Sequence, residues 1–354
     1  MNARTQRDLK DYGREGLAEL ACSLGEPPFR ASQIGRWLYR EDVATADEMT
    51  NLPASIRTRL KDEFLIGRSV IEAKATSADG SLKLRIRLAH GGVVETVHLP
   101  TARRMTVCLS SQTGCPMECA FCATGRQGPG RTLTPGEMIE QLQVVMRPTP
   151  AGAGRSRPTH VVFMGMGEPL LDPRPLVTVI RVLAWEHGFG YAMRRITVST
   201  CGIPDGIRAL ADSGLKVRLA LSLHAPWEGL RASLMPKAPS LVDVLPALRY
   251  YQETTRATLT LEYVLLAGVN DTPSCARALG ELAARLGSKI NLISFNESGE
   301  GAFHPPSPQR VASFLTVLQP IAPSVTIRQS MGRDIAAACG QLAGTTPAGD
   351  TVPP

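Results

Sequence analysis

Residues 108–122 read C-L-S-S-Q-T-G-C-P-M-E-C-A-F-C, and three of these cysteines, Cys115, Cys119 and Cys122, are spaced as C-x3-C-x2-C. Iron-sulfur cubes are held by soft thiolate ligands, and spacings of two and three residues let a single loop wrap the cluster. Three ligands for four irons leave one iron open to another molecule. The stretch therefore predicts a [4Fe-4S] cluster with Cys115, Cys119 and Cys122 as its metal ligands.

A structural zinc site is the alternative for these cysteines. Zinc usually takes four protein ligands, commonly as two separated pairs, and the sequence offers no second pair. A cluster that only carries electrons would have a fourth cysteine nearby, for which Cys108 is the local candidate. The three-cysteine spacing, with Phe121 before the last cysteine, resembles the radical S-adenosylmethionine (SAM) superfamily. The resemblance implies SAM as a cofactor bound through the open iron.

The composition is that of an ordinary globular protein, with 354 residues of which 43% are hydrophobic and 20% charged. No run of about eighteen apolar residues occurs, and residues 1–10 are too polar for a signal peptide. We therefore expect a cytoplasmic protein with no membrane partner. The eight cysteines are too sparse for a secreted disulfide scaffold, which favours metal binding and thiol chemistry.

The net charge of +7 is unevenly distributed, because residues 69–160 carry 11 Lys and Arg against 6 Asp and Glu. A basic mouth around the cysteine loop would suit the phosphate backbone of a nucleic acid. A solvated charged face explains the charge equally well. The basic residues near the loop are Lys83, Arg85, Arg87, Arg103, Arg104, Arg126, Arg131, Arg155 and Arg157.

Two regions precede the loop. Apolar residues at helical spacings predict a helical accessory module over residues 1–68. Residues 69–104 predict a β-hairpin extension that turns at Gly91-Gly92. Glu95 falls in register with the apolar side of the returning strand, so either that register is misjudged or Glu95 is a buried, functional acid.

From residue 105 onward, strands and helices alternate, which implies a parallel sheet. Six to seven units are too few for a complete eight-fold barrel, so we expect an α/β fold with an open (β/α)6 partial TIM barrel over residues 105–344. Residues 345–354 are expected to form a disordered tail. The expected strands are 106–110, 160–164, 195–199, 217–221, 258–265, 289–293 and 325–328, and the expected helices are 135–146, 174–185, 204–212, 241–252, 275–286 and 308–319.

Polar residues follow these strands at their carboxyl ends, where such barrels gather their chemistry. Glu168, after a glycine that permits close approach, would suit the SAM ammonium group. The hydroxyl, imidazole and amide groups at the other strand ends offer hydrogen bonds to ribose and adenine. Each residue alone could be an ordinary turn or core residue, but their coincidence on one rim favours a site. The expected cofactor-binding residues are Gly167, Glu168, Ser199, Ser222, Leu223, His224 and Asn296.

Two further cysteines narrow the reaction. Cys108 precedes the cluster ligands and Cys339 follows the last strand, in A-A-A-C-G-Q-L. With the motifs at residues 167–170 (G-E-P-L), 222–226 (S-L-H-A-P) and 25–30 (G-E-P-P-F-R), they resemble the RlmN/Cfr family of radical-SAM RNA adenine methyltransferases over roughly residues 20–344. The resemblance implies 23S rRNA as substrate, with tRNA left open, and an electron donor such as flavodoxin.

The same resemblance implies roles for three residues. SAM first methylates the thiolate of Cys339, and a second SAM yields a radical that removes a hydrogen from that methyl group. The resulting carbon radical joins the base, and Cys108 releases it by forming a transient disulfide with Cys339. Glu95 matches a proton acceptor of the family, and Cys108 as thiolate is a competing base. No such role is implied for Cys22, Cys201 or Cys275, although Cys201 lies close to the expected site.

The match has departures, and they leave alternatives. Residues 328–333 read R-Q-S-M-G-R, without the further basic residue that RlmN-like members carry before the glycine, and Asn296 follows Ser-Phe rather than a proline-aromatic pair. C8-specific, Cfr-like enzymes also lack that basic residue, so C8 is the alternative to C2. A methylthiotransferase would need a second group of three cysteines, and the N-terminal region offers only Cys22. A non-catalytic iron-sulfur RNA-binding protein is the rival from another class.

Overall fold

A single ten-stranded sheet organises the protein, of which the computed structural model describes residues 7–147, 157–297 and 302–343. From β6 onward the strands are parallel and follow one another across the sheet in chain order, whereas β3 to β6 form an antiparallel meander. The strands are β3 (Val70–Thr76), β4 (Leu82–Arg87), β5 (Val93–Thr101), β6 (Arg104–Leu109), β7 (His160–Phe163), β8 (Ile196–Thr200), β9 (Arg218–Ser222), β10 (Leu259–Leu265), β11 (Lys289–Ser294) and β12 (Val325–Arg328).

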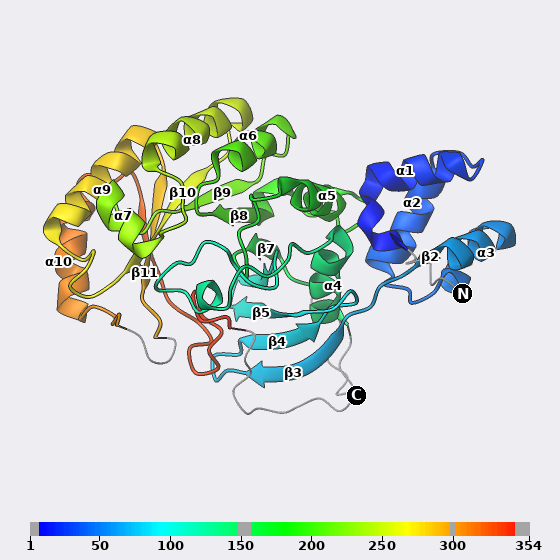
Figure 1. Cartoon of the computed structure of the whole chain (residues 1–354), viewed down its shortest axis with the longest axis horizontal. Helices are drawn as coiled ribbons and strands as arrows, with labels where there is room; N and C mark the ends of the chain where they lie inside the picture. Colours follow the sequence, from blue (N-terminus) through cyan, green and yellow to red (C-terminus); the bar gives the residue numbers. More distant parts are fainter. Residues whose placement is uncertain (1–6, 148–156, 298–301, 344–354) are drawn as a thin grey trace.

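In the described ranges six helices cover the outside of the curved sheet and connect its seven parallel strands, and a shorter helix, α7 (Glu228–Leu234), stands between β9 and α8 (Figure 1). The six helices are α4 (Pro135–Met146), α5 (Pro173–Ala184), α6 (Pro204–Asp212), α8 (Leu241–Thr255), α9 (Pro273–Leu286) and α10 (Pro308–Leu318). The two outermost strands, β12 and β3, do not pair with each other in the described sheet. The predicted open (β/α)6 partial barrel is therefore confirmed.

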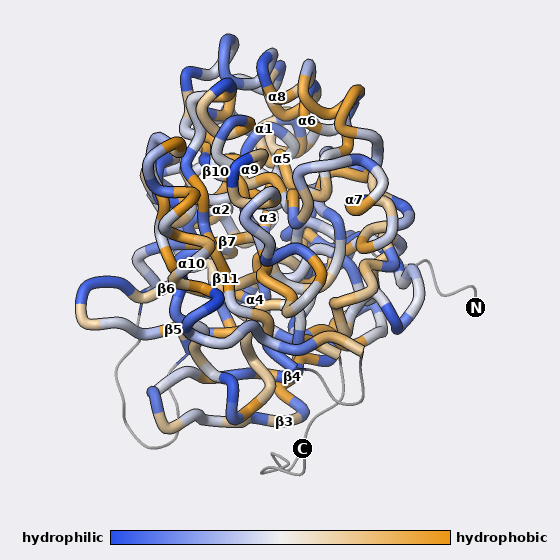
Figure 2. The backbone as a smooth tube through the Cα atoms, turned by 90° about the vertical axis from the view of Figure 1, so that its left-hand side faces the viewer, coloured by the Kyte–Doolittle hydropathy of each residue, from blue (hydrophilic) through white to orange (hydrophobic). Residues whose placement is uncertain are grey.

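Local sequence explains where most of these helices begin. Helices α4, α5, α9 and α10 each begin with a proline that follows a capping Thr, Asp or Ser. The side chain of the capping residue accepts a hydrogen bond from a free backbone N–H of the first turn, and the proline needs no such bond. Their apolar faces pack on the strands, and Figure 2 shows orange and blue alternating along the outer helices α6 and α8. No helix in the described ranges is long and apolar enough to cross a membrane.

A small helical module precedes the sheet and packs beside α4 and α5 (blue in Figure 1). A short parallel pair, β1 with β2, ties its two ends together. Lys10, which is fully buried, forms ion pairs with Glu140 of α4 and, at 3.5 Å, with Asp42. Arg147 in turn pairs with both carboxylates, at 2.7 Å from Asp42 and 3.0 Å from Glu140. The module comprises β1 (Arg7–Asp8), α1 (Gly13–Ser23), α2 (Arg30–Gly35), α3 (Ala54–Glu63) and β2 (Phe64–Leu65), with helical turns at Leu9–Tyr12, Arg36–Arg40 and Ala46–Glu48.

The predicted hairpin corresponds to β4 and β5, which turn at Gly91 and Gly92, both at positive φ. The structure adds a third strand, β3, and joins all three to the barrel through the pairing of β5 with β6. Of the two readings left open for Glu95, the structure supports burial, because its side chain is fully enclosed.

The last described residues, 329–343, run back across the open side of the barrel, and we call them the closing segment (red in Figure 1). They are tied to the first strands and their turns, because Ser77 donates to Asp334 at 2.6 Å and Ala343 N–H to Glu95 at 3.0 Å. They are also tied to the loop after β6, because Ala123 N–H donates to the carbonyl of Gly340 at 2.8 Å. The predicted tail at 345–354 lies outside the described residues.

Candidate active site

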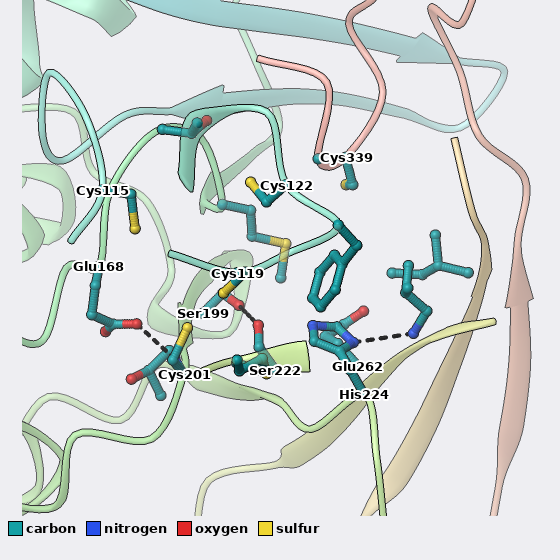
Figure 3. A pocket seen from close by; sticks show the side chains of 18 of the residues that line it. Cys115, Cys119, Cys122, Glu168, Ser199, Cys201, Ser222, His224, Glu262 and Cys339 are labelled. Atoms are coloured by element: carbon teal, nitrogen blue, oxygen red, sulfur yellow. Dashed lines mark hydrogen bonds between the residues drawn. The ribbon is translucent and has the colours of Figure 1, made fainter. Parts of the chain in front are cut away.

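The loop between β6 and α4 places the three predicted ligands, Cys115, Cys119 and Cys122, on one cavity with about 920 Å³ of empty space, which we call the cluster cavity (Figure 3). Backbone hydrogen bonds fold this loop tightly, from Cys122 N–H to the carbonyl of Cys119 at 3.0 Å and from Cys115 N–H to that of Gly128 at 2.8 Å. A Cβ at Gly125 would lie 2.9 Å from the Cys119 nitrogen, so the loop needs glycine there.

The surroundings of these thiols fit an iron-sulfur cluster. An apolar group that includes Met117, Phe121 and Phe295 packs around them and limits the access of water. Among the described residues, no three His, Cys, Asp or Glu side chains form a group that could hold a single metal ion. Three soft thiols that face one cavity suit a [4Fe-4S] cube.

Glu168 lies on the same cavity, and the structure holds its carboxylate firmly. Oε2 accepts from Cys201 N–H at 2.6 Å and Oε1 from Leu170 N–H at 3.0 Å. Burial raises the pKa of Glu168, and these N–H donors oppose that shift. At Gly167, where φ is 106°, a Cβ would meet Gln112 at 2.6 Å, so this turn also requires glycine. The pair forms a close-fitting acidic site for a cationic group.

The next two strands add Ser199 and Ser222, whose hydroxyl oxygens lie 3.4 Å apart on the cavity (Figure 3). His224 follows at a positive φ of 57° and packs edge-to-face on Phe121, with ring centres 4.8 Å apart. Its Nδ1 accepts from Val264 N–H at 3.1 Å, and burial lowers the pKa of His224 to about 3. The ring is therefore neutral and presents its Nε2–H as a hydrogen-bond donor.

Two predicted cofactor residues do not line the cavity. The Leu223 side chain is fully buried in the main core. Asn296 is buried too, and its side-chain nitrogen donates to the carbonyl of Cys339 at 3.3 Å. Its Oδ1 has no hydrogen-bond partner among the described residues.

The predicted thiol pair is brought together on a second cavity, with about 720 Å³ of empty space, which adjoins the first. Cys339 and Arg328 line both cavities, whereas Cys108 lines only the second. Burial, and then the nearby charge of Cys339, raise the pKa of Cys108 to about 12. Arg328 opposes this shift, which places its guanidinium near both thiols.

Glu95 lies behind the closing segment. Its carboxylate is 3.2 Å from Lys83 Nζ and accepts the Ala343 N–H. Lys83 also donates to the carbonyl of Ala336, so this buried ion pair anchors the segment that carries Cys339. Glu95 lines neither cavity.

Sequence reasoning missed Glu262, a buried residue of β10 on the wall of the cluster cavity. Asn291 donates to its Oε1 at 3.1 Å, while Oε2 has no hydrogen-bond partner among the described residues. The available signal was a charge in the otherwise apolar run L-T-L-E-Y-V-L. Cys201 also lines this cavity, and its thiol hydrogen-bonds with that of Cys119.

The expected basic mouth is partly neutralised by ion pairs. Arg85 and Arg87 both pair with Glu72, at 2.9 and 2.6 Å, and Arg131 pairs with Glu137 at 2.6 Å. These cross-strand and cross-loop pairings are invisible in a charge count. Arg103, in the turn after β5, and Arg104, the first residue of β6, are exposed, and Arg155 lies outside the described residues.

Comparison with known proteins adds family evidence. A family profile described as the ribosomal RNA large subunit methyltransferase N-terminal domain matches residues 7–66, and one described as the radical SAM superfamily matches residues 109–273. A dual-specificity RNA methyltransferase RlmN of Nitratidesulfovibrio vulgaris is 44% identical over 92% of this chain and 91% of its own. A probable dual-specificity RNA methyltransferase RlmN of Thermosynechococcus vestitus is 42% identical over 90% of this chain and 93% of its own.

Among solved structures, a radical SAM methyltransferase from Sphaerobacter thermophilus superposes with a TM-score of 0.87 at 37% identity. The match covers 96% of this chain and 100% of that one. The likeness therefore extends through the helical module, the meander and the barrel.

Proposed function

The chain belongs to the RlmN family of radical-SAM RNA methyltransferases, and from this premise we propose that it methylates C2 of an adenosine in 23S rRNA, with Cys339 as methyl carrier. One observation carries the proposal: Cys339 stands on the wall between the cluster cavity and the second cavity, and Cys108 lies beside it in the second. A carrier must face both its donor and its acceptor.

The first step is an ordinary displacement. The Cys339 thiolate attacks the methyl carbon of SAM, so a new S–C bond forms while the sulfonium C–S bond breaks and S-adenosylhomocysteine leaves. Asn296 holds the backbone carbonyl of Cys339 and so fixes where its sulfur lies. Glu168 would bind the SAM ammonium, and Ser199 and Ser222 its ribose hydroxyls.

Cys115, Cys119 and Cys122 would hold the [4Fe-4S] cluster. When bound, the cluster would supply one-electron reduction and oxidation, the first to cleave a second SAM to methionine and a 5′ carbon radical that removes a hydrogen from the S-methyl group, the second as the base adduct loses its proton. The chain's residues keep the methyl group of Cys339 facing this chemistry and exclude water with the apolar packing of Phe121 and Phe295. An external donor such as flavodoxin would deliver the electron.

The C2 proton has two candidate acceptors. Cys108 lines the second cavity directly, whereas Glu95 would act only across the closing segment. Replacing Glu95 by Gln separates them: if Glu95 accepts the proton, the variant keeps methylated Cys339 but loses RNA product.

Cys108 then frees the product. Its sulfur attacks the sulfur of Cys339, an S–S bond forms, and the electron pair of the broken S–C bond takes up a proton to complete the new methyl group. A cellular dithiol reduces the disulfide. Changing Cys108 to Ala should leave protein covalently attached to RNA, visible as a ribonuclease-sensitive band of reduced mobility in a denaturing gel; free protein alone would remove Cys108 from this role.

We further propose tRNA as a second substrate, supported by the words "dual-specificity" in the relatives' names. The C8 alternative is retained because Met331 stands where RlmN-like members carry a basic residue. The non-catalytic RNA-binding alternative predicts indifference to the loss of Cys339.

The deciding experiment incubates anaerobically prepared protein with SAM, a one-electron reductant and a 23S rRNA fragment, followed by mass spectrometry of the nucleosides. We expect 2-methyladenosine from wild type and none from Cys339→Ala. A product with the retention of 8-methyladenosine would support the alternative carbon. In parallel, the tryptic peptide 334–354, whose only cysteine is Cys339, should carry one added methyl.

A further inference from the structure

Cys201 is the one cysteine on the cluster cavity, among the described residues, to which the proposed reaction gives no role. It directly follows β8, and its thiol hydrogen-bonds with that of Cys119, one of the three expected cluster ligands. Figure 3 shows the two side chains next to each other on the cavity wall. Cys201 does not line the second cavity, where Cys108 lies. Its contact is therefore with the cluster ligands rather than with the thiol exchange that releases the product.

The backbone of Cys201 is held in place from two directions. Its N–H donates to Oε2 of Glu168 at 2.6 Å, and its carbonyl accepts from the guanidinium of Arg231, a fully buried residue of α7. The same helix also holds the cluster loop, because Ala120 N–H donates to the carbonyl of Leu234 at 2.9 Å. The sulfur of Cys201 is therefore fixed relative to the loop that carries the expected ligands.

A bound cluster would fix the direction of the hydrogen bond between the two sulfurs. A cysteine that ligates iron is a thiolate without a proton, so Cys119 could then only accept. Cys201 stands outside the C-x3-C-x2-C spacing, and as a thiol it has an S–H to donate. The apolar group around the three ligands also packs on Cys201, and a hydrogen bond in such surroundings is electrostatically stronger than in water.

Hydrogen bonds to the sulfurs of an iron-sulfur cluster are among the factors that set its reduction potential. Reduction adds a negative charge, and a donor to a ligand sulfur stabilises the reduced state more than the oxidised one. We propose that Cys201 is a positioning residue that acts on the cluster through Cys119, and that its S–H makes the cluster easier to reduce. This inference rests on the proposed function, in which the cluster must pass an electron to SAM.

The test compares variants that keep or remove the donor. Cys201→Ser keeps a hydroxyl donor, whereas Cys201→Ala has none. In anaerobic redox titrations of the reconstituted full-length protein without SAM, followed by electron paramagnetic resonance, Cys201→Ala should lower the equilibrium constant for cluster reduction about tenfold, a shift of about 59 mV to lower potential for one electron. Cys201→Ser should stay within threefold of wild type. Cys275→Ala is the control and should not differ from wild type, because Cys275 is a buried thiol outside both cavities.

Iron content and the Kd for SAM separate this role from others. Both should stay within twofold of wild type in Cys201→Ala, because Glu168 is held by the backbone of Cys201 and not by its side chain. An unchanged potential in Cys201→Ala overturns the inference, and so does an equal shift in Cys201→Ser. Several-fold tighter SAM binding by Cys201→Ala also overturns it, since Cys201 would then be a fourth iron ligand that competes with SAM.

Infrared difference spectra of wild type keep the inference testable if Cys201→Ala does not hold a cluster. Reduction should move one S–H stretching band to lower frequency, because the donated hydrogen bond becomes stronger, and that band should be missing from Cys201→Ser. A spectrum without such a band contradicts the inference. If reconstituted wild type itself holds no cluster, the proposed function fails first and the inference with it.

Discussion

Charged side chains are buried at two places, the interface between the helical module and α4 and the wall of the cluster cavity, and the two places differ in how these side chains are paired. Lys10 meets Glu140, Asp42 and the amide of Gln143, and Arg147 closes the network on the other side. At the cavity wall, Glu262 keeps an oxygen without a hydrogen-bond partner among the described residues.

We interpret this difference as one between residues that stabilise the fold and residues whose unpaired atoms are available to a ligand. A buried polar atom without a partner costs free energy, about 1–3 kcal/mol, which a protein tolerates where a substrate will supply the missing bond. A paired network instead makes each member expensive to remove. Removing a residue of the interface should therefore lower stability, and removing one of the wall should change chemistry.

The largest expected effect lies at the cavity. Cys119→Ala should abolish iron binding and SAM cleavage, because a cube held by two thiolates is not retained. Iron content and production of 5′-deoxyadenosine measure this. Cys275→Ala is the control, since Cys275 is a buried thiol of α9 outside both cavities. SAM cleavage that survives in Cys115→Ala, Cys119→Ala and Cys122→Ala alike would sink the cluster assignment.

A second effect compares one thiol from each region. Raising the pKa of Cys108 from 9.0 to about 12 lowers its thiolate fraction near pH 8 roughly a thousandfold, and the thiolate is the reactive form. Cys22, exposed on α1, should therefore react with iodoacetamide at least about 10³ times faster, as followed by peptide mass spectrometry. Labelling of Cys108 should rise about tenfold per pH increment of one; equal rates for the two thiols would contradict the burial of Cys108.

The third prediction breaks the paired network. Glu140→Ala leaves the buried ammonium of Lys10 without its main counter-ion and should lower the free energy of unfolding by about 3–5 kcal/mol. Urea unfolding measures the loss. Glu63→Ala removes an exposed pair with Arg59 on α3 and should shift the midpoint little. Iron binding in Glu140→Ala should persist below its unfolding temperature. If the folded variant lost its iron, the interface would also contribute to the chemistry, and the distinction between the two regions would be wrong.

The smallest effect sharpens the contrast from the other side. Burial raises the pKa of Glu262 above its ordinary value of 4.5. Between the pKa of the unfolded chain and the higher pKa of the folded one, folding takes up a proton, so the free energy of unfolding falls as the pH rises through that range. Glu262→Gln carries no such ionisable group. At pH values above the folded-state pKa of Glu262, its free energy of unfolding should exceed that of wild type by about 1–3 kcal/mol, with no difference below pH 4.5. Thermal unfolding from pH 4 to 8 checks this, with exposed Glu253→Gln as control. A variant less stable at pH 8 would mean that Arg328 already satisfies this carboxylate.

Much of the architecture followed from local chemistry in the sequence. Proline after a capping residue fixed the start of α4 at Pro135 and of α10 at Pro308, as expected. The cysteine spacing indicated which loop carries the three thiols, and the structure places all three on one cavity; that they bind a cluster stays a prediction. Glu168, Ser199 and His224 were also predictable, because each lies at or just after the carboxyl end of a parallel strand. The carboxyl ends of parallel strands lie at one edge of the sheet, so these residues line one cavity.

What escaped prediction depends on curvature and long-range pairing. Glu262 could face either the cavity or the helices. Which of the two it faces depends on how the sheet curves, and the alternation of side chains along β10 does not determine that curvature. The partner of Arg85 and Arg87 is Glu72, on a strand that the apolar pattern did not mark because its outer residues are exposed. Leu223 shares a motif with His224 yet lies in the core, because both follow the end of β9, where His224 takes a positive φ of 57° and strand alternation no longer applies.

The closing segment has a consequence for how the protein is made. The cluster cysteines emerge from the ribosome more than two hundred residues before Cys339, which at 5–20 residues per second is roughly 10–40 s. During that interval β7 to β12 are synthesised, and the growing chain has the three cysteines of the loop but lacks the closing segment that carries Cys339. Cys108 therefore cannot form a disulfide with Cys339 until synthesis is almost complete. The order of residues in the sequence delays contact between the two thiols until the strands around Cys108 have had time to form.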